Sequence, residues 1–357
     1  YSLFVAVMSP FNPDLVYSFF QSLIHIKVLL IAYFSISVFN SKKSMELFLK
    51  LFKMLVILYF LSLILNMVIG EAWNSFVGFH EQQYRYGFLR PAGIFSHYAP
   101  NSYFFTLIVT TLMLTLGSDK ANAFSYHFKK FILFIFIDFF AAFPLTVRKG
   151  IVVLIPYFFF VISILKPKLR LMVIMGLIIF ISSLLWFISE TQIFTDTIDN
   201  FDKFFRDDHS YVRGIIVYHG YSLFADFFPI GVGAGLYGTV FSNMNLSVYE
   251  YVDMNMILFT SDNGGLKGVY DSGLAALAAE MGFIGLVFVF YLTYLLMKCC
   301  SVLTSSSNLK IIKLLTVYML LLAVTEPVLQ NGFFAVFYCM SVLYIISQGR
   351  AELNDAR

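Results

Sequence analysis

Charged residues are scarce in this sequence, and their scarcity excludes an ordinary soluble fold. Only 13% of the 357 residues are Asp, Glu, Lys or Arg, whereas 59% are hydrophobic and the mean hydropathy is +0.81. A soluble protein of this length could not hide so much apolar surface in a core. The composition predicts an all-α polytopic membrane protein, counted as a single membrane domain over residues 1–357.

Cysteine and clustered histidine are also lacking, which argues against disulfides and metal sites. The three cysteines form no CxxC pair, so a disulfide framework is not expected. His97 and His209 have no clustered partners, and we expect no metal ion and no other cofactor. The sequence shows no internal repeat and no cleavable signal peptide. It begins with an apolar stretch, "YSLFVAVM", that resembles the end of a span, so N-terminal spans are expected to be missing.

Long apolar runs predict the membrane spans. A helix needs about 20 mostly apolar residues to cross a bilayer. Runs of this kind cover residues 15–40, 47–69, 100–117, 131–147, 150–165, 169–189, 273–297, 311–326 and 331–348. Between them lies one long polar interval, residues 190–272.

Lysine and arginine are concentrated in every second loop, which sets the expected orientation, because short cytoplasmic loops carry the excess. The basic loops hold Lys42, Lys43, Lys50 and Lys53; Lys120, Lys129 and Lys130; Lys166, Lys168 and Arg170; and Lys298, Lys310 and Lys313. The large loop is therefore expected on the extracytoplasmic face. It carries eleven acidic residues against four basic ones, so a nucleic-acid partner is not expected.

Arg148 and Lys149 stand on that cation-poor face, where topology does not account for them. Arginine binds phosphate oxygens through a planar fork, which suits a diphosphate at a membrane surface. Arg90, Arg148 and Arg213 lie on three separate outer segments and would form a diphosphate clamp if the bundle brings them together. Alternatively, each reaches to lipid headgroups or pairs with a loop acid such as Asp207.

The outer loop continues with an aromatic segment and a glycine-rich turn. Residues 209–228 are expected to form a helix along the membrane interface. In "PIGVGAGLYG", Gly231, Gly233 and Gly235 could let backbone amides approach an anion, or could form a simple re-entrant turn. After the turn, Asp271 could cap the next span, act in catalysis, or do both.

Two further polar residues are expected to have structural roles. Glu280 lies deep in a span and should face the bundle interior, paired or protonated. Asn101, where an outer loop enters a span, is expected to cap that helix.

The order of these pieces resembles the O-antigen polymerase and ligase superfamily of bacterial envelope glycosyltransferases. The matching stretches are "RPAGIFSHYAPNSYFF", "TVRKG", Arg213 with "FFPIGVGAG", and "DSGLAALAAEMGFIGL". They cover roughly residues 85–290. Val147 replaces a family serine, and Lys149 is inserted before Gly150. Ligases of the superfamily have His-Asn where this chain has Asp271-Ser272, which favours the polymerase branch.

The resemblance implies a type C glycosyltransferase-like helical bundle that acts on the periplasmic face of the bacterial inner membrane. The substrates would be undecaprenyl-diphosphate-linked glycans as donor and acceptor, joined into O-antigen or a related surface polysaccharide without metal. A chain-length regulator is an implied partner, besides membrane lipid. Arg148 and Arg213 would stabilise the leaving diphosphate, and Asp271 would be the base. The implied substrate-binding residues are Arg85, Arg90, His97, Asn101, Lys149, Tyr211, Gly233 and Gly235.

Two alternatives remain open. A ligase or protein glycosyltransferase of the same fold would carry a histidine near position 271. A flippase or other transporter would show several mid-membrane charges, broken helices or repeat symmetry.

Overall fold

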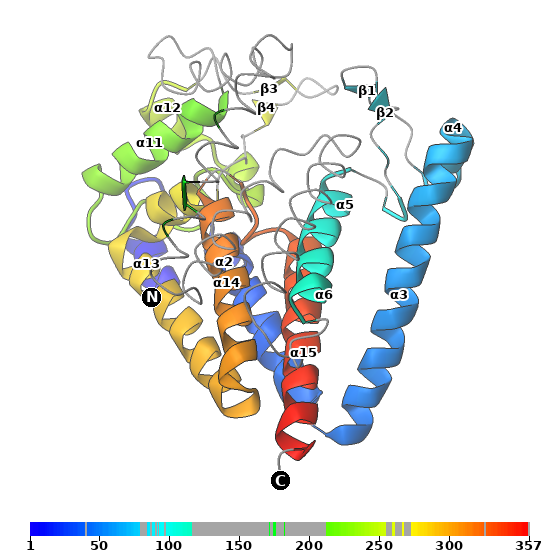
Figure 1. Cartoon of the computed structure of the whole chain (residues 1–357). Coiled ribbons are helices and arrows are strands. Elements are labelled where there is room, and N and C mark those ends of the chain that lie inside the picture. Colours follow the sequence, from blue (N-terminus) through cyan, green and yellow to red (C-terminus); the bar gives the residue numbers. More distant parts are fainter. Residues whose placement is uncertain are drawn as a thin grey trace. The chain divides into compact units, whose positions relative to one another are not determined.

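The protein is a multi-pass membrane protein built from α-helices, as a computed structural model shows (Figure 1). The structure describes residues 1–39, 41–78, 84–85, 88–89, 91, 93–95, 98–115, 171, 174–175, 182, 212–254, 259–260, 266–267, 273–324 and 326–355. Five of the helices in these ranges are long and apolar enough to cross a membrane. Each of them coincides with a span expected from the apolar runs, so those five predictions are confirmed.

The elements follow one another as helices with two short hairpins. The long helices are α2 (Leu15–Val38), α3 (Lys42–Ile69), α13 (Leu274–Leu303), α14 (Ser306–Ala323) and α15 (Gly332–Asp355). The shorter ones are α1 (Ser2–Met8), α4 (Glu71–Phe76), α5 (Tyr98–Phe104), α6 (Thr110–Thr115), α11 (Val212–Asp226) and α12 (Ser247–Tyr251), with a π-helix at Phe105–Val109 and a 3-10 helix at Val240–Met244. The hairpins pair β1 (Tyr84–Arg85) with β2 (Phe88–Leu89) and β3 (Phe259–Thr260) with β4 (Leu266–Lys267).

The other four expected spans lie wholly or partly outside the described residues. The run at 100–117 is helical from Tyr98 to Thr115, through α5, the π-helix and α6. The runs at 131–147 and 150–165 lie outside the described residues, as does nearly all of 169–189. The large loop of 190–272 is described from residue 212 onward, except for 255–258, 261–265 and 268–272. Within it, the helix expected over residues 209–228 is α11, Val212–Asp226, and its position along the membrane interface stays a prediction.

Local chemistry explains where α3 begins and ends. The side chain of Ser41 accepts a hydrogen bond from the Ser44 amide, which caps the first turn. The helix ends at Gly70, whose positive φ of 50° suits a residue without Cβ and whose amide donates to the Asn66 carbonyl. Its 28 residues give a length of about 42 Å, more than the roughly 30 Å of hydrocarbon that it must cross.

The chain divides into two compact units. The first comprises Tyr1–Ile31, Asp196–Leu296 and Met319–Ala335, and the second comprises Ala32–Thr195, Met297–Tyr318 and Val336–Arg357. In the second unit, aromatic rings of α3, α5 and α15 pack together: Phe104 lies 4.2 Å from Tyr59 and 5.0 Å from Phe337 between ring centroids. Such pairs add stability beyond the apolar area they bury.

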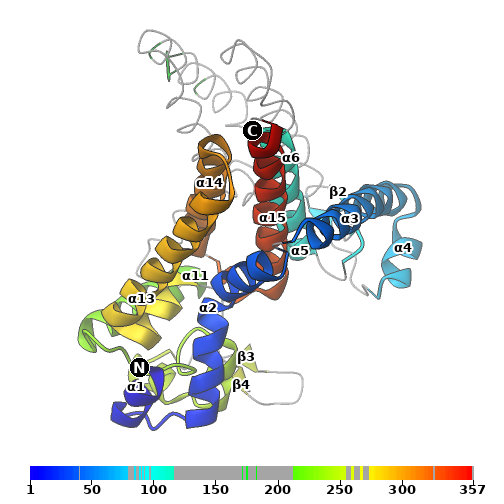
Figure 2. The ribbon, with the colours of Figure 1, turned by 90° about the horizontal axis from the view of Figure 1, so that it is seen from below.

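The first unit has its own core around α11, α12 and the segment between them. Ile216, Leu223, Val232, Tyr237 and Tyr249 are buried there. Residues 1–14 join this core. The Ser9 hydroxyl donates to the Val232 carbonyl, and the side-chain Nδ2 of Asn245 donates to the Phe11 carbonyl. Figure 2 shows α1 beside the beginning of α2. Residues 1–14 and 212–254 are thus in contact.

Candidate functional site

A buried glycine turn (residues 231–239) follows α11 and supports the rest of the site. Gly231, Gly233, Gly235 and Gly238 all have positive φ, from 63° to 112°. L-residues with a Cβ are strained in this region, whereas glycine is not. A Cβ on Gly231 would also lie 2.6 Å from the Gly282 nitrogen. The glycines are therefore required by the backbone path of the turn.

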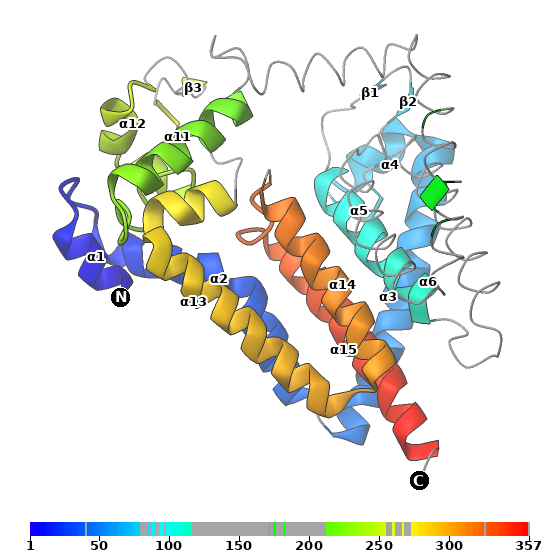
Figure 3. The same cartoon turned by 60° about the vertical axis from the view of Figure 1, so that its left-hand side comes forward.

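The turn fills a break in membrane helix α13. Gly282 has φ 59° and ψ −162°, so the helix is interrupted there (Figure 3). In a continuous helix the carbonyls of Ala279, Glu280 and Met281 would accept from residues 283, 284 and 285. The first accepts instead from the Val232 amide at 2.8 Å, the second from the Gly233 amide at 3.0 Å, and the third from the Tyr1 hydroxyl at 2.8 Å. The broken helix therefore leaves these three carbonyls satisfied, as an apolar medium requires.

The carboxylate of Glu280 ties the break to α2 and to the glycine turn. Its Oε2 lies 2.7 Å from His25 Nε2, and both side chains are fully buried. Its Oε1 accepts from the Tyr237 amide at 2.9 Å and from the Thr239 hydroxyl at 2.8 Å. We call these four residues the Glu280 cluster. The prediction that Glu280 faces the interior and is paired is confirmed.

The Glu280 cluster lies deep along α2. His25 follows the first residue of α2, Leu15, by ten positions, which places it about 15 Å along the helix axis. If α2 crosses the bilayer, this is near the middle of the hydrocarbon layer. Gln21 lies one turn earlier on the same face. Its side-chain Nε2 and Oε1 are buried and have no hydrogen-bond partner among the described residues, and the same holds for His25 Nδ1.

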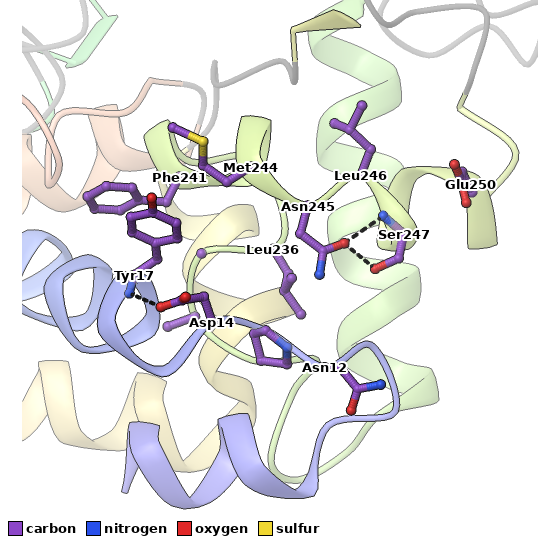
Figure 4. A pocket seen from close by; sticks show the side chains of 13 residues that line it. Asn12, Asp14, Tyr17, Leu236, Phe241, Met244, Asn245, Leu246, Ser247 and Glu250 are labelled. Carbon is purple, nitrogen blue, oxygen red and sulfur yellow. Dashed lines mark hydrogen bonds between the residues drawn. The ribbon is translucent and has the colours of Figure 1, made fainter.

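A cavity of about 520 Å³ opens where α2 begins, between residues 12–17 and the segment 234–250 (Figure 4). Its polar lining consists of Asn12, Asp14, Tyr17, Asn245, Ser247 and Glu250. The described residues that line it include two carboxylates and no lysine or arginine. The described lining residues therefore carry a net negative charge.

Hydrogen bonds and ring stacking fix the walls of the cavity. The rings of Tyr17 and Phe241 are stacked, with centroids 5.2 Å apart and planes 16° apart. Asp14 Oδ1 accepts from the amides of Val16 at 2.7 Å and Tyr17 at 3.1 Å, and so caps α2. Asn245 Oδ1 accepts from the amide and hydroxyl of Ser247, at 3.0 and 2.6 Å (Figure 4). These walls are held before any ligand arrives.

The glycine turn links the cavity to the Glu280 cluster. Gly235 and Leu236 line the cavity, and the next residue, Tyr237, donates its amide to Glu280. The glycine turn is also tied to α2, because the Ser18 hydroxyl donates to the Ala234 carbonyl at 2.7 Å. Burial, together with the neighbouring Tyr249, raises the pKa of Tyr237 well above its ordinary value, so this phenol stays neutral and donates to the Ile216 carbonyl at 2.7 Å.

The predicted substrate-binding glycines have different environments. The amide of Gly233 is already bonded to the Glu280 carbonyl, and the amides of Val232, Tyr237 and Gly238 also have partners. An anion site made from these four amides is therefore not available in this structure. Gly235 lines the cavity, where its predicted role in binding substrate stays a prediction.

Two of the predicted site arginines, Arg85 and Arg213, lie in described segments. Arg213 belongs to the first turn of α11, and Arg85 pairs with Phe88 in the β1–β2 hairpin. The other predicted site residues lie outside the described residues: Arg90, His97, Arg148, Lys149, Tyr211 and Asp271. The expected meeting of Arg90, Arg148 and Arg213 therefore stays a prediction.

Asn101 does not cap its helix, and that prediction is wrong. The helix begins at Tyr98, so Asn101 lies inside its first turn. Its Nδ2 donates to the Pro91 carbonyl at 2.7 Å, and its buried Oδ1 accepts no hydrogen bond among the described residues. The residue instead holds the preceding loop against α5, because the loop carbonyl needs a donor once it is buried.

Residues of α2 are the part of the site that the sequence reading missed. Ser18, Gln21 and His25 follow one another at spacings of three and four, so they share one face of a helix. A polar stripe of this kind in an apolar span indicates an inward face with a role beyond packing. The polar stripe is visible in "YSFFQSLIHIK", but the stripe alone does not predict that His25 pairs with Glu280 on α13.

The arrangement offers a preformed, negatively charged cavity at the end of a membrane helix. Stacked rings supply an apolar face, and amide, hydroxyl and carboxylate groups supply hydrogen bonds, which is suited to a polyhydroxylated ligand. Within the described residues, His, Cys, Asp and Glu form no group of three that could hold a metal ion. Comparisons of the chain with protein-family models and with curated proteins find no match.

Proposed function

We propose that this protein is a membrane glycosyltransferase that joins lipid-diphosphate-linked oligosaccharide repeat units into a surface polysaccharide. Two kinds of observation support the proposal. The four sequence stretches that resemble O-antigen polymerases occur in the family's order, and the chain is a multi-pass α-helical membrane protein. The Asp271-Ser272 pair, in place of His-Asn, favours a polymerase over a ligase.

The observation that carries the proposal is the cavity at the beginning of α2. Asp14 caps the first turn of a helix long and apolar enough to cross the membrane, so the cavity lies beside one end of a span. The sugar of a lipid-linked glycan sits at this depth, because its diphosphate is anchored at the membrane surface. A cavity with stacked rings, amides and carboxylates matches a sugar better than it matches the diphosphate, which needs cations.

In the proposed reaction, a hydroxyl oxygen of one repeat unit attacks the anomeric carbon of a glycan linked to undecaprenyl diphosphate. The bond between that carbon and the diphosphate oxygen breaks, and undecaprenyl diphosphate leaves with the electron pair. Asp271 accepts the hydroxyl proton, and Arg148 and Arg213 neutralise the charge that develops on the leaving group. Arg90, with Arg85, orients the second lipid diphosphate.

The proposed setting is the periplasmic face of a bacterial inner membrane. This follows from the placement of lysine and arginine in alternate loops and from the resemblance, not from the fold. The proposed partners are the lipid-linked donor and acceptor and a chain-length regulator.

The test is the gel pattern of surface glycan in a strain that lacks the gene. A polymerase defect leaves lipid A with a single repeat unit and removes the ladder, whereas loss of every repeat points to a ligase or a flippase. Complementation with Arg148→Ala should fail to restore the ladder, and Lys120→Ala, a cation of a predicted inner loop, should restore it. A full ladder with Arg148→Ala would remove Arg148 from the proposed mechanism.

A specific observation favours a transporter as the second candidate. Discontinuous membrane helices with charged residues near the break are typical of secondary transporters, and α13 is broken at Gly282 beside Glu280 and His25. Against this, the chain shows no internal repeat. Accumulation of untranslocated lipid-linked repeat units in the deletion strain would favour the transporter.

A further inference from the structure

The charge of the cavity distinguishes between classes of sugar. Its polar lining includes Asp14 and Glu250, and the described lining residues include no cation. We infer that the cavity is a sugar subsite that accepts a neutral or amino sugar and rejects sugars that carry a carboxylate, such as uronic acids. The inference rests on the proposed function for the source of the sugar, a lipid-linked repeat unit.

Tyr17 and Phe241 provide the apolar side of the subsite. Their rings are stacked on each other, so the facing sides are covered and the platform for a sugar is an outer face of the pair. Tyr17 keeps 37% of its surface exposed. A pyranose has one face of C–H groups, and the partial positive charge of these hydrogens matches the negative face of an aromatic ring. The platform does not depend on the sugar's charge, so it contributes affinity to all pyranoses.

The polar side provides acceptors for hydroxyl or ammonium protons. Both cap bonds of Asp14 use Oδ1, so within the described part of the chain Oδ2 remains to accept a hydrogen bond from a ligand. Glu250 is exposed on α12 at the cavity rim. Asn245 and Ser247 add neutral amide and hydroxyl groups between the two carboxylates, and Asn12 adds a further amide below them (Figure 4).

Electrostatics then sets the discrimination. A uronate placed in the cavity brings a third negative charge near two carboxylates, and repulsion at a few ångströms is weakly screened in a partly enclosed site. Removing a hydrated carboxylate from water without a cation to replace the water is also unfavourable. A hydroxyl pays neither penalty, and an ammonium group gains from both carboxylates.

The volume is compatible with this occupant. Small-molecule sites commonly measure about 300–1,000 Å³, and this cavity of about 520 Å³ falls in that range. The glycine turn and the capped start of α2 hold the walls, so little ordering is required when the sugar binds.

The binding test uses the full chain in nanodiscs and saturation-transfer difference NMR. Three matched probes are methyl glucoside, methyl glucosaminide and methyl glucuronide, repeated in the galacto and manno series to cover stereochemistry. We expect the neutral and amino sugars of at least one series to bind at least tenfold more tightly than the matching uronide at pH 7. Equal binding of the uronide, or no binding by any series, would overturn the inference.

Variants show whether the signal comes from the cavity. Tyr17→Ala should reduce binding of all sugars at least tenfold, whereas Tyr33→Ala, which removes an exposed tyrosine of the same helix, should leave it unchanged. The double variant Asp14→Asn with Glu250→Gln should abolish the discrimination against the uronide. Asparagine still caps the helix, so the unfolding temperature should stay the same. Discrimination that survives the double variant would overturn the inference.

The two proposals can fail separately. Charge-selective binding in a protein whose deletion leaves the glycan ladder intact would refute the polymerase and support the subsite. A ladder lost on deletion, combined with uronide binding as tight as that of the neutral sugar, would refute the subsite alone.

Discussion

Replacing Glu280 with alanine tests whether the Glu280 cluster holds the first unit together. The substitution removes the acceptor of the Tyr237 amide and the Thr239 hydroxyl and the partner of His25. The side chain of Glu280 is fully buried. Water therefore cannot take over these bonds without entering the core.

The expected loss of stability can be bounded from these contacts. Glu280→Ala leaves the Tyr237 amide, the Thr239 hydroxyl and the His25 ring without this buried partner, and each buried group left without a partner costs about 1–3 kcal/mol. We expect Glu280→Ala to lower the free energy of unfolding by about 3–5 kcal/mol. Glu280→Gln keeps an acceptor oxygen for Tyr237 and Thr239, so it should lose only about 1–2 kcal/mol.

The assay is unfolding of the full chain in detergent micelles, followed by far-UV circular dichroism. Thr293→Ala is the matched control, because Thr293 is buried on the same helix and, among the described residues, its hydroxyl bonds only to the Val289 carbonyl of that helix. A double-mutant cycle with His25→Ala measures the coupling directly. If Glu280→Ala costs less than about 1 kcal/mol and the cycle shows no coupling, the reasoning about this cluster is wrong.

Three further predictions concern the turn, the cap and alkaline pH. Gly231 has φ 80°, and a new Cβ there would lie 2.6 Å from backbone atoms. Gly231→Ala should therefore lower the free energy of unfolding by about 2–5 kcal/mol. Gly332→Ala is the control, because its Cβ meets nothing within 4 Å, and it should be neutral in the same assay. Asp14→Ala should cost about 1 kcal/mol and Asp14→Asn much less, because only alanine removes the cap. Burial raises the pKa of Tyr1 to about 12, so its contribution is present below about pH 10 and is lost as pH rises toward 12. Tyr1→Phe should therefore flatten this part of the stability profile, and an unchanged slope would contradict it.

Apolar length was sufficient to find the long helices, but it did not locate their ends. The run at 47–69 predicts only the apolar part of α3, which begins at Lys42 because Ser41 caps it. Likewise, α15 continues to Asp355, past the apolar run that ends at residue 348. A helix continues outside the bilayer wherever its residues favour it, so hydropathy identifies the span and not the whole element.

The site could be predicted only where its signal was local. The glycines of residues 231–235 marked a special backbone path, and Glu280 in a span indicated an inward-facing, paired group. Their partners could not be inferred, because His25 and Glu280 lie 255 positions apart in the chain. For the same reason the sequence leaves both an anion site and a simple re-entrant turn open for these glycines, whereas two amides of the turn complete a broken helix.

The break in α13 explains why a cavity with fixed walls exists at this end of the first unit. Once Gly282 interrupts the helix, the freed carbonyls require donors, and the glycine turn and Tyr1 supply them. The Glu280 carboxylate then holds the same turn by the Tyr237 amide, two residues beyond Gly235. The position of the cavity wall is therefore set by bonds deep in the membrane and not by the exposed carboxylate at its rim. The charge of Glu250 can consequently be changed without moving the wall, whereas Asp14 contributes both to selectivity, through its charge, and to stability, through its cap of α2.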